Sequence, residues 1–335
     1  MVLVIFGLPD TNVPVWDVIP RCSVMINALK RIRAKIPHTV SIWVDSGGFQ
    51  ILAKGLQVDI LSLLQTYRDI DADFYISLDI PPQRLGEFSK ELIITNLRNF
   101  EYLYERLEGK LIVPVVHASL HPEAIIEFID SIKSYGCKYL ACGGAVPLIM
   151  SRWGQGTKLY ALMAMTLVRR LFSGWIHALG VGGSNVMKAL IAAVGFNSFD
   201  SSAWRIKAAY GKVIVPGVGE RYVGDRGVRF GRTRLSKEEL SLLVTFLRNT
   251  NFPYVNEVDK LLQTFTGRAI INAWVLAYSR PDDPRSYSRS RFRWLFERLS
   301  EIKGLSLEEL RSAMAKIAES HRNTTERLVN LNRRG

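Results

Sequence analysis

Three aspartates stand directly after short segments of apolar or small residues, where they could act together in catalysis. Asp45 closes Ser41-Ile42-Trp43-Val44 and is followed by Ser46-Gly47-Gly48, while Asp79 and Asp200 end two later segments. Carboxylates in such places can attack an electrophilic carbon or transfer a proton. The glycines lack a Cβ, so the backbone there can approach a flat ligand. The alternative is that each aspartate only caps a helix or a turn.

These segments belong to an alternation of short strands and helices. Such an alternation predicts a parallel α/β sheet, in which catalytic residues normally follow the carboxyl ends of the strands. The number of strands favours a closed (β/α)8 TIM-like barrel over a doubly wound open sheet, with an eighth strand at 213–215. The predicted strands are 2–7, 39–45, 74–79, 111–117, 138–142, 175–180 and 197–200, and the predicted helices are 22–35, 57–70, 89–107, 121–135, 156–172 and 184–194.

The pattern changes after residue 235. Ser236 and Glu239 have the spacing of a capping box, which marks the start of a helix. We therefore predict a barrel domain over 1–235, with a basic insertion at 205–234, and a helical C-terminal region over 236–335. The helical periodicity of this region covers 237–249, 255–279, 288–303 and 306–330.

The composition indicates a soluble globular protein with a polyanionic partner. The chain has 335 residues, is 48% apolar and carries a net charge of +13. No apolar stretch is long enough to span a membrane. Cys22, Cys137 and Cys142 lack close Cys-x-x-Cys spacing, which argues for a reducing compartment, and we expect the cytoplasm. The positive charge fits nucleic acid better than a small neutral substrate, although general solubility is an alternative reason for it.

The positive charge is concentrated after Asp200. Between residues 205 and 234 eight basic side chains stand against Glu220 and Asp225, a net charge of +6. We predict that this segment contacts the phosphates of a nucleic acid. The predicted contacts are Arg205, Lys207, Arg221, Arg226, Arg229, Arg232 and Arg234.

Several short motifs occur together in the order of one known family. Asp-Ser-Gly-Gly-Phe-Gln begins at Asp45, Ser-Leu-Asp-Ile-Pro-Pro begins at Ser77, Leu-Gly-Val-Gly-Gly begins at Leu179, and Phe199-Asp200 follows. Over roughly residues 1–215 this chain resembles the guanine transglycosylases, pentosyltransferases that exchange a guanine in a polynucleotide for a 7-deazaguanine base. The resemblance independently implies a barrel.

The resemblance also implies roles for individual residues. Asp200 corresponds to the nucleophile that forms a covalent intermediate, and Asp45 to the general acid and base that moves the proton between the leaving and entering bases. Asp79 corresponds to the acid that reads the guanine edge, and His117 stands where the family usually has a glutamine. The implied base-binding set is Asp79, Ser46, Gly47, Phe49, His117, Gly143 and Gly144, and the residues beside ribose or phosphate are Gly180, Gly182 and Gly183.

The chain also departs from the family pattern. Family members normally hold a structural zinc with a Cys-x-Cys-x-x-Cys cluster and a histidine, but no cysteine follows Cys142, so we predict no zinc. Asp200 is followed by Ser201-Ser202-Ala203-Trp204, where tRNA enzymes usually have a Pro-Thr-Arg-like segment. Both departures favour an enzyme that inserts a base such as preQ0, the co-substrate, into DNA.

Two other interpretations stay open. One is a tRNA-guanine transglycosylase of the queuosine or archaeosine type. The other, from a different class, is a non-catalytic homologue that binds nucleic acid, although the presence of Asp45, Asp79 and Asp200 together argues against it. We expect no cofactor and no membrane. The partners left open are a helper ATPase, nuclease-like modification proteins and a second copy of the chain.

Overall fold

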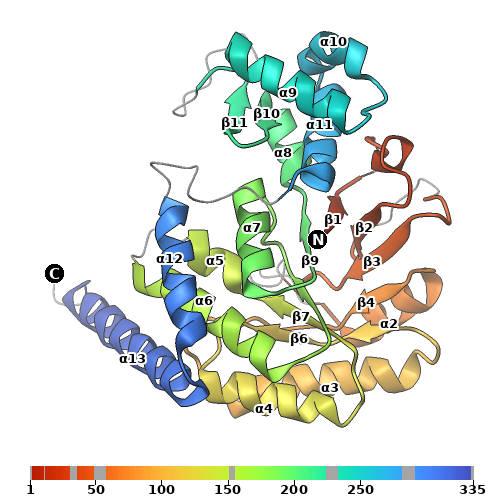
Figure 1. Cartoon of the computed structure of the whole chain (residues 1–335). Coiled ribbons are helices and arrows are strands. Elements are labelled where there is room, and N and C mark those ends of the chain that lie inside the picture. The colour runs from red at the N-terminus through yellow and green to blue at the C-terminus, as the bar shows by residue number, and fades with distance from the viewer. Residues whose placement is uncertain are drawn as a thin grey trace. The chain divides into compact units, whose positions relative to one another are not determined.

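The computed structural model describes residues 2–10, 12–30, 36–48, 58–150, 155–223, 233–280 and 291–332. Its main feature is a nine-stranded parallel sheet with the order β5-β4-β3-β2-β1-β9-β8-β7-β6 (Figure 1). The strands are β1 Leu3–Leu8, β2 Ser23–Asn27, β3 Ser41–Asp45, β4 Phe74–Ile76, β5 Ile112–Val113, β6 Val115–His117, β7 Tyr139–Gly143, β8 Trp175–Ala178 and β9 Ser198–Ser201.

The two ends of this strand order, β5 and β6, are consecutive pieces of chain separated by Pro114 alone. A proline has no N–H to give to a sheet, so it interrupts the strand at this point. Because β5 pairs with β4 and β6 pairs with β7, this single extended segment has neighbours on both sides. Counted as one strand it gives eight, which is the strand number of a (β/α)8 barrel, and the predicted fold class is confirmed.

Helices alternate with these strands and then dominate the C-terminal third of the chain. Most of the helices predicted from the sequence are present, and the capping box at Ser236 is confirmed. The helices are α2 Ile60–Asp69, α3 Lys90–Arg106, α4 Pro122–Lys133, α5 Ala145–Met150, α6 Gln155–Leu171, α7 Asn185–Val194, α8 Ala203–Ala209, α9 Lys237–Asn249, α10 Val258–Gln263, α11 Phe265–Tyr278, α12 Arg291–Gly304 and α13 Leu307–Asn332.

Two sequence predictions are wrong. The helix predicted over 22–35 is replaced at Ser23–Asn27 by strand β2, which is buried along almost its whole length and pairs with β1. An apolar run that is buried on both faces has no alternation, so its periodicity does not separate a strand from a helix. The strand predicted at 213–215 forms, as β10 Lys212–Val215, but it pairs antiparallel with β11 Gly219–Tyr222 in a separate two-stranded sheet. The missing barrel strand is therefore β2.

The chain divides into two compact units, which we describe separately. The first contains residues 1–43, 180–192 and 197–293, and the second contains residues 44–179, 193–196 and 294–335. The first unit includes α9, α10 and α11, while most of α12 and all of α13 belong to the second. The boundary near residue 235 stays a prediction.

The first unit is organised around α11, which packs on α8 and β10. Asn272 of α11 is fully buried, and its side chain accepts a hydrogen bond from the N–H of Ile214 at 2.7 Å. The same amide donates to the carbonyl oxygens of Trp204 and Lys212, both at 3.1 Å. A buried amide with all these partners holds helix, hairpin and α8 in one arrangement, because any shift would leave polar groups unpaired.

Lys188 of α7 is fully buried at the other end of α11. Its ammonium group donates to the carbonyl oxygens of Leu276 and Ser279 at 2.8 Å and of Ala277 at 3.3 Å. The last carbonyls of a helix lack partners within the helix and carry partial negative charge. Lys188 therefore satisfies the end of α11 and ties α7 to it.

We expect Lys188→Met to lower the free energy of unfolding by about 3 kcal/mol, because methionine fills similar space but leaves buried carbonyls without a donor. The midpoint of urea unfolding, followed by tryptophan fluorescence, measures this change. Lys260→Met is the matched control, since the Lys260 side chain is 84% exposed and its ammonium group is 4.0 Å from the carboxylate of Glu257, a weak surface pair. Equal midpoints for the two variants would contradict this role of Lys188.

In the second unit α13 packs on α6 and α4 (Figure 1). Arg311 of α13 donates two hydrogen bonds to Glu123 at the start of α4, at 2.7 and 2.9 Å. Gly86 has a φ of +68°, and a Cβ at this position would overlap Ala318 of α13. A glycine is required here both by the backbone conformation and by the close approach of the helix.

Candidate functional site

In the second unit, Asp79 lies in the loop after β4 and is only 6% exposed. Ser46, in the loop after β3, donates a hydrogen bond from its hydroxyl to Oδ1 of Asp79 at 3.3 Å. A Cβ on Gly48 would overlap the same carboxylate and would lie 2.9 Å from the backbone oxygen of Asp79. The loops after two neighbouring strands thus meet directly, and glycine is the residue that permits this contact.

Two asparagines of α3 fix the loop on either side of Asp79. The side chain of Asn96 accepts from the N–H of Ile80 at 2.8 Å and donates to the carbonyl of the same residue at 3.1 Å. Asn99 donates to the carbonyl of Leu78 at 3.2 Å. The sequence analysis missed both residues, although two asparagines three positions apart on one helix face are a detectable signal. Their hydrogen bonds hold Asp79 in place through its backbone.

His117 ends β6 beside Asp79 and is 3% exposed. Its Nε2 atom lies 2.9 Å from Oδ2 of Asp79, which is an ion-pair distance. The ring is not aligned for a hydrogen bond to this oxygen, and within the described part of the chain neither ring nitrogen has a hydrogen-bond partner. Buried polar atoms normally have partners, so an unsatisfied one indicates a place for a ligand or water.

The other side of the His117 ring faces two glycines at the end of β7. A Cβ on Gly143 would lie 3.0 Å from Nδ1, and a Cβ on Gly144 would lie 3.4 Å from Nδ1 and 2.8 Å from the hydroxyl of Ser119. Gly144 also has a φ of +72°, which disfavours other residues. The two glycines keep side-chain atoms away from the unpaired nitrogen.

Asp45 ends β3 and is half-buried. It acts electrostatically on Tyr67 of α2, a fully buried tyrosine whose hydroxyl donates to the carbonyl of Ile76 at 2.6 Å. Burial raises the pKa of Tyr67 well above its ordinary value, and the negative charges of Asp45 and Asp79 raise it further. The phenol therefore stays neutral beside both carboxylates. The sequence analysis missed Tyr67, since nothing local distinguishes it from an ordinary core tyrosine.

In the first unit, Asp200 lies on β9 and is half-buried. Its Oδ1 atom accepts a hydrogen bond from the N–H of Gly180 at 2.5 Å, and its backbone carbonyl accepts from the N–H of Gly182 at 3.3 Å. Gly180 has a φ of +68°, a conformation that a glycine adopts without strain. The 180–182 turn thus orients one oxygen of the carboxylate with a backbone donor.

We expect Gly182→Ala to destabilise the protein by about 1–3 kcal/mol, because its Cβ would overlap the ring of Phe199, which is fully buried. The urea midpoint measures the loss. Gly183→Ala is a matched control for stability, since a Cβ there meets only the Cβ of Ala203 at an ordinary 3.6 Å. If both variants unfold at the same midpoint, the turn tolerates a larger residue and the packing argument fails.

Three of the predicted phosphate contacts have partners inside the protein. Arg205 is 6% exposed and its guanidinium lies 2.7 Å from Asp10, whose pKa it lowers by hydrogen bonding. Lys207 is paired with Glu220 at 2.8 Å and donates to the carbonyl of Gly183. Arg221 is paired with Glu239 at 2.7 Å. Acidic partners within the protein thus occupy all three side chains.

The remaining predicted residues fall into two groups. Arg234 is exposed, as a phosphate contact requires. Gly47, which the resemblance places in the base-binding set, has a φ of +89° and lies in the loop after β3. Phe49, Arg226, Arg229 and Arg232 lie outside the described residues.

The described residues include no cluster of three or more histidine, cysteine or acidic side chains that could hold a metal ion. Cys22, Cys137 and Cys142 are free thiols, and burial raises the pKa of the Cys142 thiol to about 12. Of the helices in the described ranges, none combines the length and the apolar character that crossing a membrane requires.

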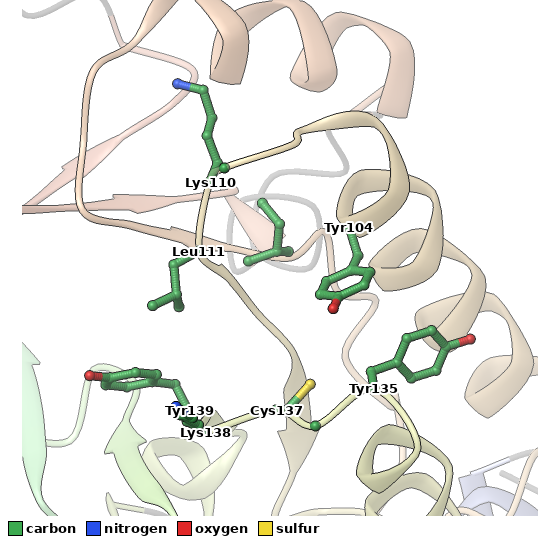
Figure 2. Close-up of a pocket in the computed structure, with 10 residues that line it drawn as sticks. Tyr104, Lys110, Leu111, Tyr135, Cys137, Lys138 and Tyr139 are labelled. Carbon is green, nitrogen blue, oxygen red and sulfur yellow. The ribbon is translucent and has the colours of Figure 1, made fainter.

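A hollow of about 310 Å³ opens elsewhere in the second unit, at the amino ends of β5 and β7 (Figure 2). Figure 2 shows the hydroxyl groups of Tyr135 and Tyr139 pointing away from one another and Lys110 extending away from the other side chains. The ammonium group of Lys110 donates hydrogen bonds to the carbonyl of Ile70 and the hydroxyl of Tyr75, both at 2.8 Å. Polar groups do not converge in this hollow, so it is a poor candidate for the chemistry.

No family model matches the chain. It is 31% identical over 269 residues to uncharacterized protein 306 of Sulfolobus islandicus rod-shaped virus 1, a match that covers 79% of each chain. The chain belongs to the family of this viral protein.

Two further relatives are named as transglycosylases. The chain is 25% identical over 182 residues to a tRNA-guanine(15) transglycosylase of Korarchaeum cryptofilum, and 27% identical over 177 residues to one of Methanosarcina mazei. Each match covers 52% of this chain but only 30% and 36% of the two relatives, so the chain spans about a third of their length. These partial matches support a guanine transglycosylase-like superfamily and a transferase.

Proposed function

We propose that this protein is a guanine transglycosylase, which exchanges guanine in a polynucleotide, most favourably DNA, for a 7-deazaguanine base such as preQ0. One observation carries the proposal. Four segments that are far apart in the sequence, at 46–48, 79, 117–119 and 143–144, meet around a buried carboxylate and an unsatisfied imidazole in the second unit. Such a set suits the recognition of a flat polar ligand better than a purely structural role.

Asp79 is proposed to read the base. A carboxylate accepts two parallel hydrogen bonds, and guanine offers them from N1–H and its 2-amino group. Adenine cannot supply this pair. The 7-deazaguanines share the same edge, so one carboxylate can read both the leaving and the entering base.

Asp200 is proposed to make the covalent bond. A carboxylate oxygen of Asp200 attacks C1′ of the target nucleotide, the bond from C1′ to N9 breaks, and guanine leaves with a proton that Asp45, protonated at the start, supplies to N9. In the second half, Asp45 takes the N9 proton of the 7-deazaguanine, N9 attacks C1′, and the carboxylate of Asp200 is released. No water or nucleoside triphosphate is consumed, and Asp45 ends protonated and Asp200 ionised, each as it began.

DNA is favoured as the polynucleotide by two features of the chain. No cysteine follows Cys142, so the cysteine cluster typical of the family is not formed within this chain, and Ser201-Ser202-Ala203-Trp204 replaces the segment usual in tRNA enzymes. The target guanine must leave the base stack before C1′ and the base edge can be reached, so single-stranded or flipped-out guanine is the expected substrate. A tRNA substrate is the second candidate, because the relatives from Korarchaeum cryptofilum and Methanosarcina mazei are tRNA-guanine(15) transglycosylases.

The proposal is tested by guanine exchange. The purified chain is incubated with radiolabelled guanine and, in parallel, with single-stranded DNA, duplex DNA and bulk tRNA. Label that enters DNA supports the DNA enzyme, and label that enters only tRNA supports the second candidate. If no polynucleotide takes up label, and if unlabelled preQ0 releases no labelled guanine from prelabelled polynucleotides, the proposed activity is wrong for this chain.

A further inference from the structure

The two nitrogens of His117 face different surroundings. Nε2 lies 2.9 Å from the carboxylate of Asp79, while Nδ1 faces the space that the glycines at 143 and 144 leave open. Neither nitrogen has a hydrogen-bond partner among the described residues. At this place the imidazole can either accept or donate a hydrogen bond at Nδ1, and the charge of the ring decides which of the two it does.

In the neutral ring only one nitrogen carries a hydrogen. If that hydrogen is on Nε2, toward Asp79, then Nδ1 presents a lone pair and repels an acceptor such as O6 of guanine. In the cationic ring both nitrogens are donors. The cation can therefore pair with Asp79 through Nε2 and donate from Nδ1 to O6 of a base that Asp79 holds by its N1–H and 2-amino groups.

We propose that His117 binds the base in its cationic form, so that protonation of this one side chain selects a 6-oxopurine edge and makes base affinity depend on pH. This inference rests on the proposed function. The sign follows from the chemistry: the Nδ1 donor is present at low pH and is lost as the pH rises through the titration of the ring. A glutamine at this position would donate from its amide at every pH.

The surroundings of His117 contain few other groups that titrate. Asp79 supplies the counter-charge, and Asp45 adds a second carboxylate in the same unit. Tyr67 and Cys142 stay neutral, because burial raises the pKa of Tyr67 well above its ordinary value and the pKa of Cys142 to about 12. Ser46, Ser119 and the glycines of β7 carry no charge. Among these groups Asp79 thus supplies the charge that faces Nε2 of His117.

The test is the affinity for radiolabelled guanine, measured by equilibrium dialysis between about pH 5 and 8. We expect the affinity of the wild-type chain to fall as the pH rises, with a limiting slope of about tenfold per pH unit. The variant His117→Gln should bind with an affinity that does not change over this range. His121→Asn is the matched control, because the His121 side chain caps α4 and asparagine can cap it as well, so this variant should follow the wild type.

A flat profile for the wild type, or the same slope in His117→Gln, would overturn the inference. A second readout on the wild-type chain avoids any folding defect of the variant. The chain has five histidines, so ¹⁵N-labelled imidazole resonances can be resolved, and guanine should move both His117 nitrogens to the protonated position. If guanine exchange proceeds but the affinity for guanine does not change with pH, only this inference is contradicted. If the chain neither binds nor exchanges guanine, the proposed function is contradicted as well.

Discussion

Replacing Asp200 by asparagine is expected to reduce base exchange by a factor on the order of 10³ or more, because an amide is a poor nucleophile toward C1′. The amide oxygen can still accept the hydrogen bond from Gly180, which is 2.5 Å from Oδ1 in the wild type. The turn at 180–182 should therefore keep its conformation. The loss should appear in the chemical step and leave the unfolding midpoint nearly unchanged.

Two measurements check this prediction. The first is the rate at which labelled guanine enters the polynucleotide. The second is the covalent adduct between the protein and a labelled oligonucleotide, which the wild type should show on a denaturing gel and Asp200→Asn should not. Asp259→Asn is the control, since Asp259 is an exposed carboxylate in the same unit. An adduct that persists in Asp200→Asn would assign the nucleophile to another residue.

Much of the fold could be predicted from local patterns. The alternation of strands and helices located seven of the eight barrel strands, because each strand is a short apolar run bounded by turn residues. It missed Ser23–Asn27, a strand buried along almost its whole length, and it assigned residues 213–215 to the barrel. The first error concerns the type of element, which periodicity cannot decide for a run buried on both faces, and the second concerns which strand pairs with which. Pairing depends on contacts between distant segments, and a local pattern contains no information about it.

The same limit applies to the site. The motifs indicated Asp45, Asp79, His117 and Asp200, because aspartates, glycines and a histidine at strand ends are visible in the sequence. The residues that hold this set, such as Asn96 and Tyr67, could not be recognised before their partners were known. In the basic segment 205–234 the charged residues are visible in the sequence, but their partners are not. Its net charge suggested a phosphate surface, but Arg205 and Lys207 are neutralised by acids that are 195 and 13 positions away in the chain.

Replacing Asp79 by asparagine is expected to lower kcat/KM for guanine exchange by about 10² to 10³-fold. The variant loses two charge-assisted hydrogen bonds to the base, each worth about 1.5–3 kcal/mol, and part of that loss is recovered by the amide oxygen. Its amide NH2 group would instead face the N1–H or the 2-amino group of guanine, where two donors repel one another. The measurement is the initial rate of guanine incorporation at several guanine concentrations. Asp71→Asn, at an exposed carboxylate shortly before β4, is the control.

This variant differs from Asp200→Asn in a way that separates base reading from covalent chemistry. Because guanine and the 7-deazaguanines share the N1–H and 2-amino edge, the loss should be the same for both bases, and the ratio of their rates should not change. Asp79 is also the acid beside Nε2 of His117, at 2.9 Å, so its removal takes away the counter-charge of the imidazole. The pH dependence of base affinity should therefore weaken in Asp79→Asn. A variant that keeps both its kcat/KM for guanine exchange and its pH profile would show that Asp79 does not read the base.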